Sequence, residues 1–153
     1  MFRLLIAIPL LIIGCGSDVC NPYTPKMTGE DVALIMELEE VFVGAGYDVP
    51  CCPVYLLKEG DIRLEYLDKM KSCGAMKGEL GDHCTFIMVD ATQTRKGCSN
   101  VPRTVFHEWL HEQGHPDGEA IRILVDRLLY FYAEYLNRNL SNRHFAGCER
   151  RGL

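Results

Sequence analysis

The chain of 153 residues carries 21 acidic and 16 basic side chains, which gives a net charge of −5, and 48% of its residues are hydrophobic. This apolar content argues against a disordered chain, and the length suits one compact domain with its own core. An acidic balance supplies no overall basic field, so we expect no nucleic-acid partner.

The N-terminus carries an apolar run, Leu4 to Gly14, behind Arg3. This run is too short to span a bilayer and is typical of a secretory signal peptide over residues 1–14. The segment Leu11-Ile12-Ile13-Gly14-Cys15 resembles a bacterial lipobox. The resemblance implies cleavage before Cys15 and a diacylglycerol on its sulfur. The alternative is an ordinary disulfide cysteine after an ordinary signal peptide. Either way we expect an exported protein.

Under the lipobox interpretation, the protein is anchored by lipid to a membrane of the bacterial cell envelope, on its periplasmic or cell-surface face. Residues 15–27 then form a tether, and residues 28–153 form the folded domain. The eight cysteines contain no C-x-x-C pair, which favours disulfides over a thiolate zinc site. If Cys15 carries lipid, an odd number remains, so one thiol stays unpaired. We expect the adjacent Cys51 and Cys52 to have different partners, because a bridge between neighbours strains the peptide.

The predicted elements begin with a helix over 28–43. Thr28 can cap it, acidic residues follow in the first turn, apolar residues recur at helical spacing, and Gly44 follows its end. Next, Val54–Leu57 and Ile62–Leu67 flank a Lys-Glu-Gly-Asp turn, and the second run alternates apolar and polar residues. This pattern predicts a β-hairpin with one solvated face.

A glycine-rich stretch over 73–82 separates the hairpin from a third, more buried strand, Thr85–Val89. Ser99 or Asn100 can cap a helix that has Pro102 in its first turn and runs to about residue 113. Asp117 can cap a last helix, which reaches about Asn139. The expected fold is therefore α+β: an N-terminal helix, a short sheet of three to four mostly antiparallel strands, and two helices, braced by disulfides.

The chemistry concentrates in the motif His107-Glu108-x-x-His111. The two histidines stand one helical turn apart, so they share a face and can bind one zinc ion, while Glu108 lies beside them as a general base for a zinc-bound water. If the helix continued, His115 would lie about 12 Å along the axis from His107. A break at Gly114 is therefore needed before any downstream residue can reach the metal.

The longer string from His107 to Asp117, H-E-x-x-H-x-x-G-x-x-D, resembles the metzincin zinc peptidases, in the variant of the snapalysin-type bacterial enzymes. The resemblance implies a small zincin-like domain in which His107, His111 and Asp117 ligate Zn²⁺, Glu108 is the general base and Gly114 turns the chain. It implies hydrolysis of peptide bonds in a protein or peptide substrate. A Met-turn is not found, because no methionine follows Met88.

The third ligand leaves alternatives open. Asp117 can be a plain helix cap without a metal, and Glu119, in the first turn of the next helix, and His115 are rival ligands. Glu134 lies too far along that helix. Thr85–Asp90 can be an edge strand that pairs with an extended substrate, or an ordinary core strand. No residue is assigned to stabilise an oxyanion, because the downstream aromatic residues are typical of core or rim positions: Tyr130, Tyr132, Tyr135 and His144.

Two function classes follow. The first is a membrane-anchored zinc endopeptidase that acts outside the cytoplasm. The second is a non-catalytic, disulfide-braced lipoprotein that binds metal or a protein partner. Glu108 favours the enzyme, since a structural metal site needs no base beside its first histidine. The sequence does not predict the oligomeric state.

Overall fold

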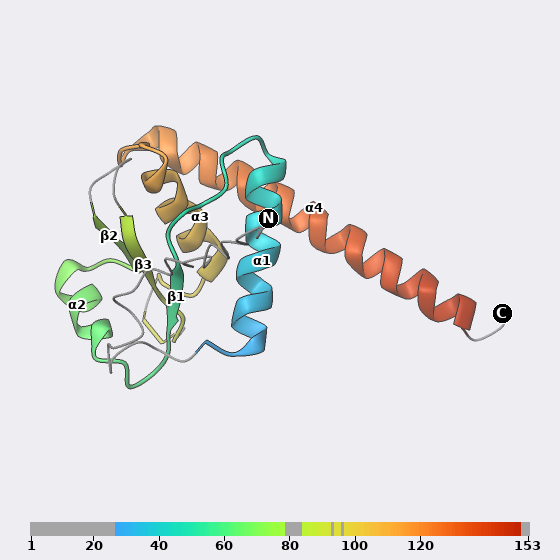
Figure 1. The fold of residues 1–153 in the computed structure, drawn as a ribbon, viewed down its shortest axis with the longest axis horizontal. Helices are drawn as coiled ribbons and strands as arrows, with labels where there is room; N and C mark the ends of the chain where they lie inside the picture. Colours follow the sequence, from blue (N-terminus) through green and yellow to red (C-terminus); the bar gives the residue numbers. More distant parts are fainter. Residues whose placement is uncertain (1–26, 79–83, 93, 96, 151–153) are drawn as a thin grey trace, which may run out of the picture.

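The computed structural model describes residues 27–78, 84–92, 94, 95 and 97–150, with only the backbone for 84, 85 and 141–150. The expected signal peptide, the lipid on Cys15 and nearly all of the tether lie outside these residues. Within them the fold is α+β, with four helices and one mixed sheet of three strands (Figure 1). The elements in chain order are α1 (Gly29–Gly44), β1 (Val54–Leu57), α2 (Arg63–Met70), β2 (Gly74–Gly78), β3 (Cys84–Asp90), α3 (Val101–Glu112) and α4 (Glu119–Arg150).

The sheet has the order β1-β3-β2, with β3 in the centre. β3 runs parallel to β1, with Val54 opposite Ile87, and antiparallel to β2, with Ala75 opposite Met88. The expectation of a mostly antiparallel sheet is therefore wrong. The edge-strand interpretation of Thr85–Asp90 is also wrong, because this segment is paired on both sides. The strands at the two edges are β1 and β2, and the glycine-rich sequence did not reveal β2.

The predicted hairpin is wrong in its second half, where residues 63–70 form the helix α2. The Asp61 carboxylate accepts the backbone N–H of the first helical residue at 2.9 Å, which favours a helix start over a strand. Leu67 is fully buried and Leu64, three residues earlier, packs beside it, whereas Ile62 and Tyr66 are 55% and 49% exposed. The side chains that pack in the core are thus three residues apart, as in a helix, and do not occupy every second position, as in a strand. α2 instead lies in the connection between the parallel strands β1 and β3.

The helices cover both faces of the sheet. Along β3, Ile87 and Val89 point into the larger core and Met88 into the smaller one, as alternation along a strand requires. α2 packs on the face of Met88. α3 packs on the opposite face, and α1 and α4 pack against α3 (Figure 1). The larger core contains fully buried side chains from these three helices: Leu38, Phe42, Val105, Phe106, Trp109, Leu110, Ile121, Val125 and Leu128.

Local signals at the helix ends explain which predictions succeeded. α1 begins at the predicted cap: Thr28 accepts the N–H of Asp31 at 3.1 Å, and the Asp31 carboxylate accepts the N–H of Thr28 at 3.1 Å. α3 begins after Asn100 with Pro102 in its first turn, also as predicted. α4 extends to Arg150, well past residue 139, and projects beyond the body (Figure 1). In the described part of the chain, no helix combines the length and apolar content needed to cross a membrane.

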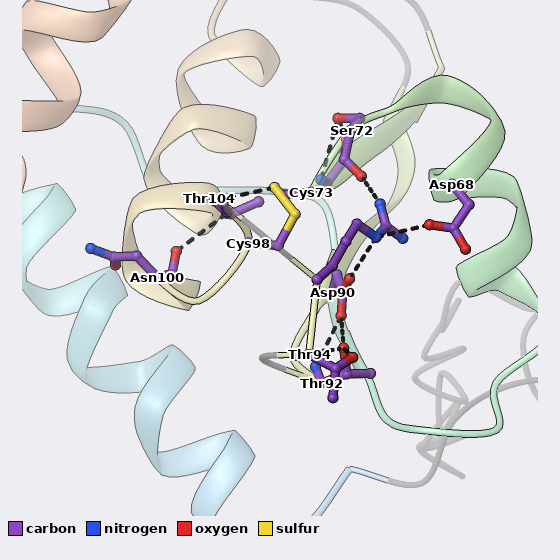
Figure 2. Close-up of a disulfide and its surroundings, with 12 residues drawn as sticks. Asp68, Ser72, Cys73, Asp90, Thr92, Thr94, Cys98, Asn100 and Thr104 are labelled. Atoms are coloured by element: carbon purple, nitrogen blue, oxygen red, sulfur yellow. Dashed lines mark hydrogen bonds and ion pairs between the residues drawn. A yellow bond between two sulfur atoms is a disulfide. The ribbon is translucent and has the colours of Figure 1, made fainter.

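A disulfide joins Cys73, at the start of β2, to Cys98, in the loop before α3 (Figure 2). Beside it, the Arg95 guanidinium contacts the Asp90 carboxylate at 3.4 Å and donates to the Ser72 carbonyl at 2.7 Å. The edge strand is thus tied to the loop that leads into α3. Cys52 is disulfide-bonded and Cys51 is a free, exposed thiol, so these neighbours are not bridged to each other, as expected.

Candidate metal centre

Three side chains converge at the end of α3. The Nε2 atoms of His107 and His111, one turn apart, lie 2.9 Å from each other. One carboxylate oxygen of Asp117, Oδ1, lies 3.3 Å from the first and 3.1 Å from the second. Both histidines are partly buried and Asp117 is exposed, so the group lies at the surface of a cleft. Among the described residues, these are the His, Cys, Asp or Glu side chains whose ligand atoms lie close enough together to share one metal ion.

The turn after α3 brings Asp117 back to the histidines. Gly114 has a φ of 89°, its N–H donates to the His111 carbonyl at 2.9 Å, and the N–H of His115 donates to the Leu110 carbonyl at 3.0 Å. This pair of bonds is the Schellman motif, which ends a helix with a left-handed residue, usually glycine. The predicted break at Gly114 is confirmed, and it reverses the chain so that Asp117 faces the helix it has just left.

The same turn orients His111. Its Nδ1 donates a hydrogen bond to the His115 carbonyl at 2.7 Å, which leaves a lone pair on Nε2. Burial, and then the neighbouring His111, lower the pKa of His107, which favours its neutral form. The carboxylate oxygen of Asp117 is also an acceptor. Lone-pair atoms this close to one another repel unless a proton or a cation lies between them.

The spacing of these atoms fits zinc. Nitrogen and oxygen ligands at about 2.0 to 2.1 Å in a tetrahedron lie about 3.3 Å from one another. The three distances in the protein, 2.9, 3.1 and 3.3 Å, are close to that value. Two imidazoles and one carboxylate also leave a fourth tetrahedral position free, as catalytic zinc sites require. The residues present therefore fit Zn²⁺.

Glu108 lies next to this group and is only 5% exposed. Its carboxyl group has no hydrogen-bond or ion-pair partner within the part of the chain that the structure describes. Burial, and then the negative charge of Asp117, raise the pKa of Glu108 to about 7. A cation held by the neighbouring ligands would favour the charged form. A buried, unpaired carboxyl of this kind is more common at functional sites than elsewhere.

The edge strand β2 lines the site. A cavity of about 390 Å³ is bounded by β2, by the end of α2 and by the three candidate ligands. Its lining residues are Met70, Ser72, Gly74, Ala75, Met76, His107, Glu108, His111, Pro116 and Asp117. Gly74 allows the close approach of β2 to α3. A Cβ atom at this position would lie 2.6 Å from Cγ2 of Thr104 and 3.1 Å from Oε1 of Glu108.

The rival ligands have other partners. The Glu119 carboxylate forms an ion pair with Arg122 at 3.2 Å, and the His115 ring packs edge-on against Tyr47. No backbone N–H of the described residues donates to the carboxylate of Asp117, so it contacts the histidines and does not act as a side-chain cap of α4. Glu134, which fitted poorly as a ligand, instead accepts a hydrogen bond from the Tyr130 hydroxyl at 2.9 Å.

The downstream aromatic residues do not line the cavities that contain His107. Tyr135 donates to Glu40 at 2.9 Å, and Tyr132 packs edge-on against Phe106. The side chain of His144 lies outside the described residues. These observations agree with leaving the oxyanion role unassigned among them.

Sequence reasoning missed three residues beside the site: Gly74, Arg103 and Arg122. Arg103 stands one helical turn before His107, so the helical spacing could have revealed it. Packing of β2 on α3 brings Gly74 next to Glu108, and packing of α4 on α3 brings Arg122 into a cavity that His107 also lines.

The chain matches no known protein family, no curated protein and no solved structure.

Proposed function

We propose that this protein hydrolyses peptide bonds with the help of one zinc ion held by His107, His111 and Asp117. The observation that supports the proposal is the convergence of three lone-pair atoms within 3.3 Å, beside a buried carboxyl group that has no partner among the described residues. Zinc in such a site polarises a carbonyl group and makes water more acidic.

Glu108 acts as the general base. It accepts a proton from the water whose oxygen forms a bond to the carbonyl carbon, and it donates that proton to the amine nitrogen when the C–N bond breaks. Without the ion, burial raises the pKa of Glu108 to about 7, and the charge of a bound cation would lower it, which favours the ionised form that a base needs. The Nδ1–H bond of His111 to the His115 carbonyl holds this imidazole in the orientation that ligation needs.

The substrate we propose is an extended peptide segment that lies along β2. Among the described strands, β2 pairs with β3 alone, and its residues Gly74, Ala75 and Met76 line the cavity beside Glu108. Backbone pairing with such an edge provides affinity without regard to sequence, and the flanking side chains provide selectivity.

The first test is the zinc content of the purified chain, measured by elemental analysis for the wild type, His111→Ala and Asp117→Ala. We expect about one zinc per chain in the wild type and strongly reduced zinc in both variants, because three protein ligands are needed to hold the ion. Glu119→Ala is the matched control and should keep its zinc. Full zinc in Asp117→Ala would contradict the proposed third ligand.

The second test compares cleavage of a mixed library of blocked peptides by the wild type and by Glu108→Gln, with products identified by mass spectrometry. The substitution removes the base and keeps the shape of the side chain, so zinc should stay bound while the cleavage rate falls by a factor of about 100 or more. Equal cleavage by both proteins would contradict the mechanism. Stoichiometric zinc without cleavage by the wild type would support the alternative, a non-catalytic lipoprotein that binds metal or a protein partner.

We also propose that the protein is exported and held at a cell-envelope membrane by lipid on Cys15. The support is the lipobox-like sequence that ends at this residue. Labelling of bacteria that express the full chain with radioactive palmitate should mark the wild type and leave Cys15→Ser unlabelled. Equal labelling of the two proteins would contradict the anchor.

A further inference from the structure

A second cavity, of about 210 Å³, opens beside the candidate metal centre. It shares Ser72, Gly74, His107 and Glu108 with the larger cavity, so the two adjoin at the buried carboxyl group, and together they are called the cleft below. Two arginines, Arg103 and Arg122, line the smaller cavity and not the larger one.

The two arginines come from different elements. Arg103 lies on α3, one turn before His107, and Arg122 lies in the first turn of α4. The packing of α4 on α3 therefore places two positive charges along the smaller cavity, in a chain whose net charge is −5. Each guanidinium group can bind an anionic ligand group if that group replaces the acidic side chain with which the arginine is paired.

Both arginines already have acidic neighbours. Arg103 contacts Asp126 at 2.5 Å and Arg122 contacts Glu119 at 3.2 Å. All four side chains are between 47% and 72% exposed. Ion pairs this exposed are weak, so a carboxylate of a bound ligand can compete for the guanidinium groups inside the cavity. Arginine is suited to this role because its planar guanidinium binds a carboxylate through two parallel hydrogen bonds.

The larger cavity adds apolar side chains. Apart from the candidate ligands His111 and Asp117, the residues that line only the larger cavity are Met70, Ala75, Met76 and Pro116. A ligand that fills the whole cleft thus meets apolar side chains in the larger cavity and two positive charges in the smaller one.

We propose that Arg103 and Arg122 form a carboxylate-binding subsite, which selects peptides with an acidic group on one side of the reacting bond and an apolar side chain on the other. The inference rests on the proposed function and names its substrate class. The carboxylate can belong to an internal Asp or Glu side chain or to a free C-terminus.

The test is equilibrium binding of dansyl-labelled peptides to the Glu108→Gln protein, measured by fluorescence anisotropy with zinc and again after removal of zinc. The internal probes are Ala-Leu-Glu-Ala amide and Ala-Glu-Leu-Ala amide, each beside its Gln counterpart. The terminal probes are Ala-Leu-Ala as the free acid and as the amide. Binding needs no turnover, so the result does not depend on whether the wild type cleaves peptides.

We expect at least one acidic probe to bind about tenfold more tightly than its neutral counterpart, with or without zinc. The additional double substitution Arg103→Gln/Arg122→Gln should abolish this preference, and Arg138→Gln, which removes one charge from α4 away from the cleft, should retain it. A preference confined to the free acid identifies the C-terminus as the source of the carboxylate. A preference confined to the internal probes identifies a side chain.

Three results would overturn the inference: equal binding of acidic and neutral probes, no binding of any probe, or a preference that survives the double substitution. Thermal unfolding of each variant checks that it is folded. An arginine-dependent preference in a protein whose wild type cleaves no peptide would contradict the proposed function and leave the subsite in place.

Discussion

Replacement of Gly74 by alanine tests whether close packing of β2 on α3 shapes the site. The added methyl carbon would lie 2.6 Å from Cγ2 of Thr104 and 3.1 Å from Oε1 of Glu108. The φ angle of Gly74 is not positive, so the backbone itself accepts an L-residue. Any loss of stability must therefore come from the contacts of the new methyl group.

The contact with Thr104 should dominate the cost. Carbon atoms attract best at about 3.5 to 4.0 Å, so a separation of 2.6 Å forces the Thr104 side chain, the helix or the strand to move. Overpacking of this kind costs about 1 to 3 kcal/mol, and we expect a loss of about 2 kcal/mol in the free energy of unfolding. Thr104→Ser removes the clashing methyl group and keeps the hydroxyl, which donates to the Asn100 carbonyl at 3.3 Å. Gly74→Ala should thus cost about 1 kcal/mol less in a Thr104→Ser background.

Urea unfolding followed by circular dichroism measures these differences. Gly44→Ala is the matched control, because a Cβ atom there has nothing within 4 Å and the position is helical. It should leave stability unchanged or raise it by up to about 1 kcal/mol. An equal loss for Gly74→Ala in the wild-type and Thr104→Ser backgrounds, or no loss in either, would refute the argument from packing.

Three further predictions concern the turn, the first helix and the disulfide. Gly114→Ala should weaken zinc binding about tenfold, because an alanine at a φ of 89° costs about 1 to 2 kcal/mol. Competition with a chelating dye measures the affinity for zinc. Unchanged affinity would show that this turn does not position the third ligand. Burial alone would raise the pKa of Asp31, but hydrogen bonds with Lys58 and with the backbone and hydroxyl of Thr28 lower it below 3.8. Because the folded-state pKa is the lower one, the advantage of the wild type over Asp31→Asn in urea unfolding should be present above about pH 4 and shrink as the pH falls through 3.8; a difference that does not change with pH would contradict this. Cys73→Ser/Cys98→Ser should lose about 3 kcal/mol of unfolding free energy, as expected for a closed loop with a sequence separation of 25, and no loss would contradict a stabilising role for the bridge.

The sequence by itself determined the features that depend on neighbouring residues. Thr28 and Asp31 cap each other within one turn, and Asn100 with Pro102 begins α3, because helix ends are stabilised by side chains three residues away or fewer. The spacing of His107 and His111 fixes them on one helix face for the same reason, and Gly114 supplies the left-handed residue that ends the helix.

Tertiary structure alone decided the features that depend on distant residues. Residues 62–67 alternate as a strand would, yet 63–67 belong to the helix α2, in which Leu67 is buried against the sheet. β2 has the sequence Gly-Ala-Met-Lys-Gly, whose glycines are unfavourable in strands, and it forms only because its backbone pairs with β3. The closeness of Gly74 to Glu108, and of Arg122 to Arg103, likewise arises only when β2 and α4 pack on α3. A helix turn is encoded within a few residues, whereas the burial that joins separate elements depends on the whole chain.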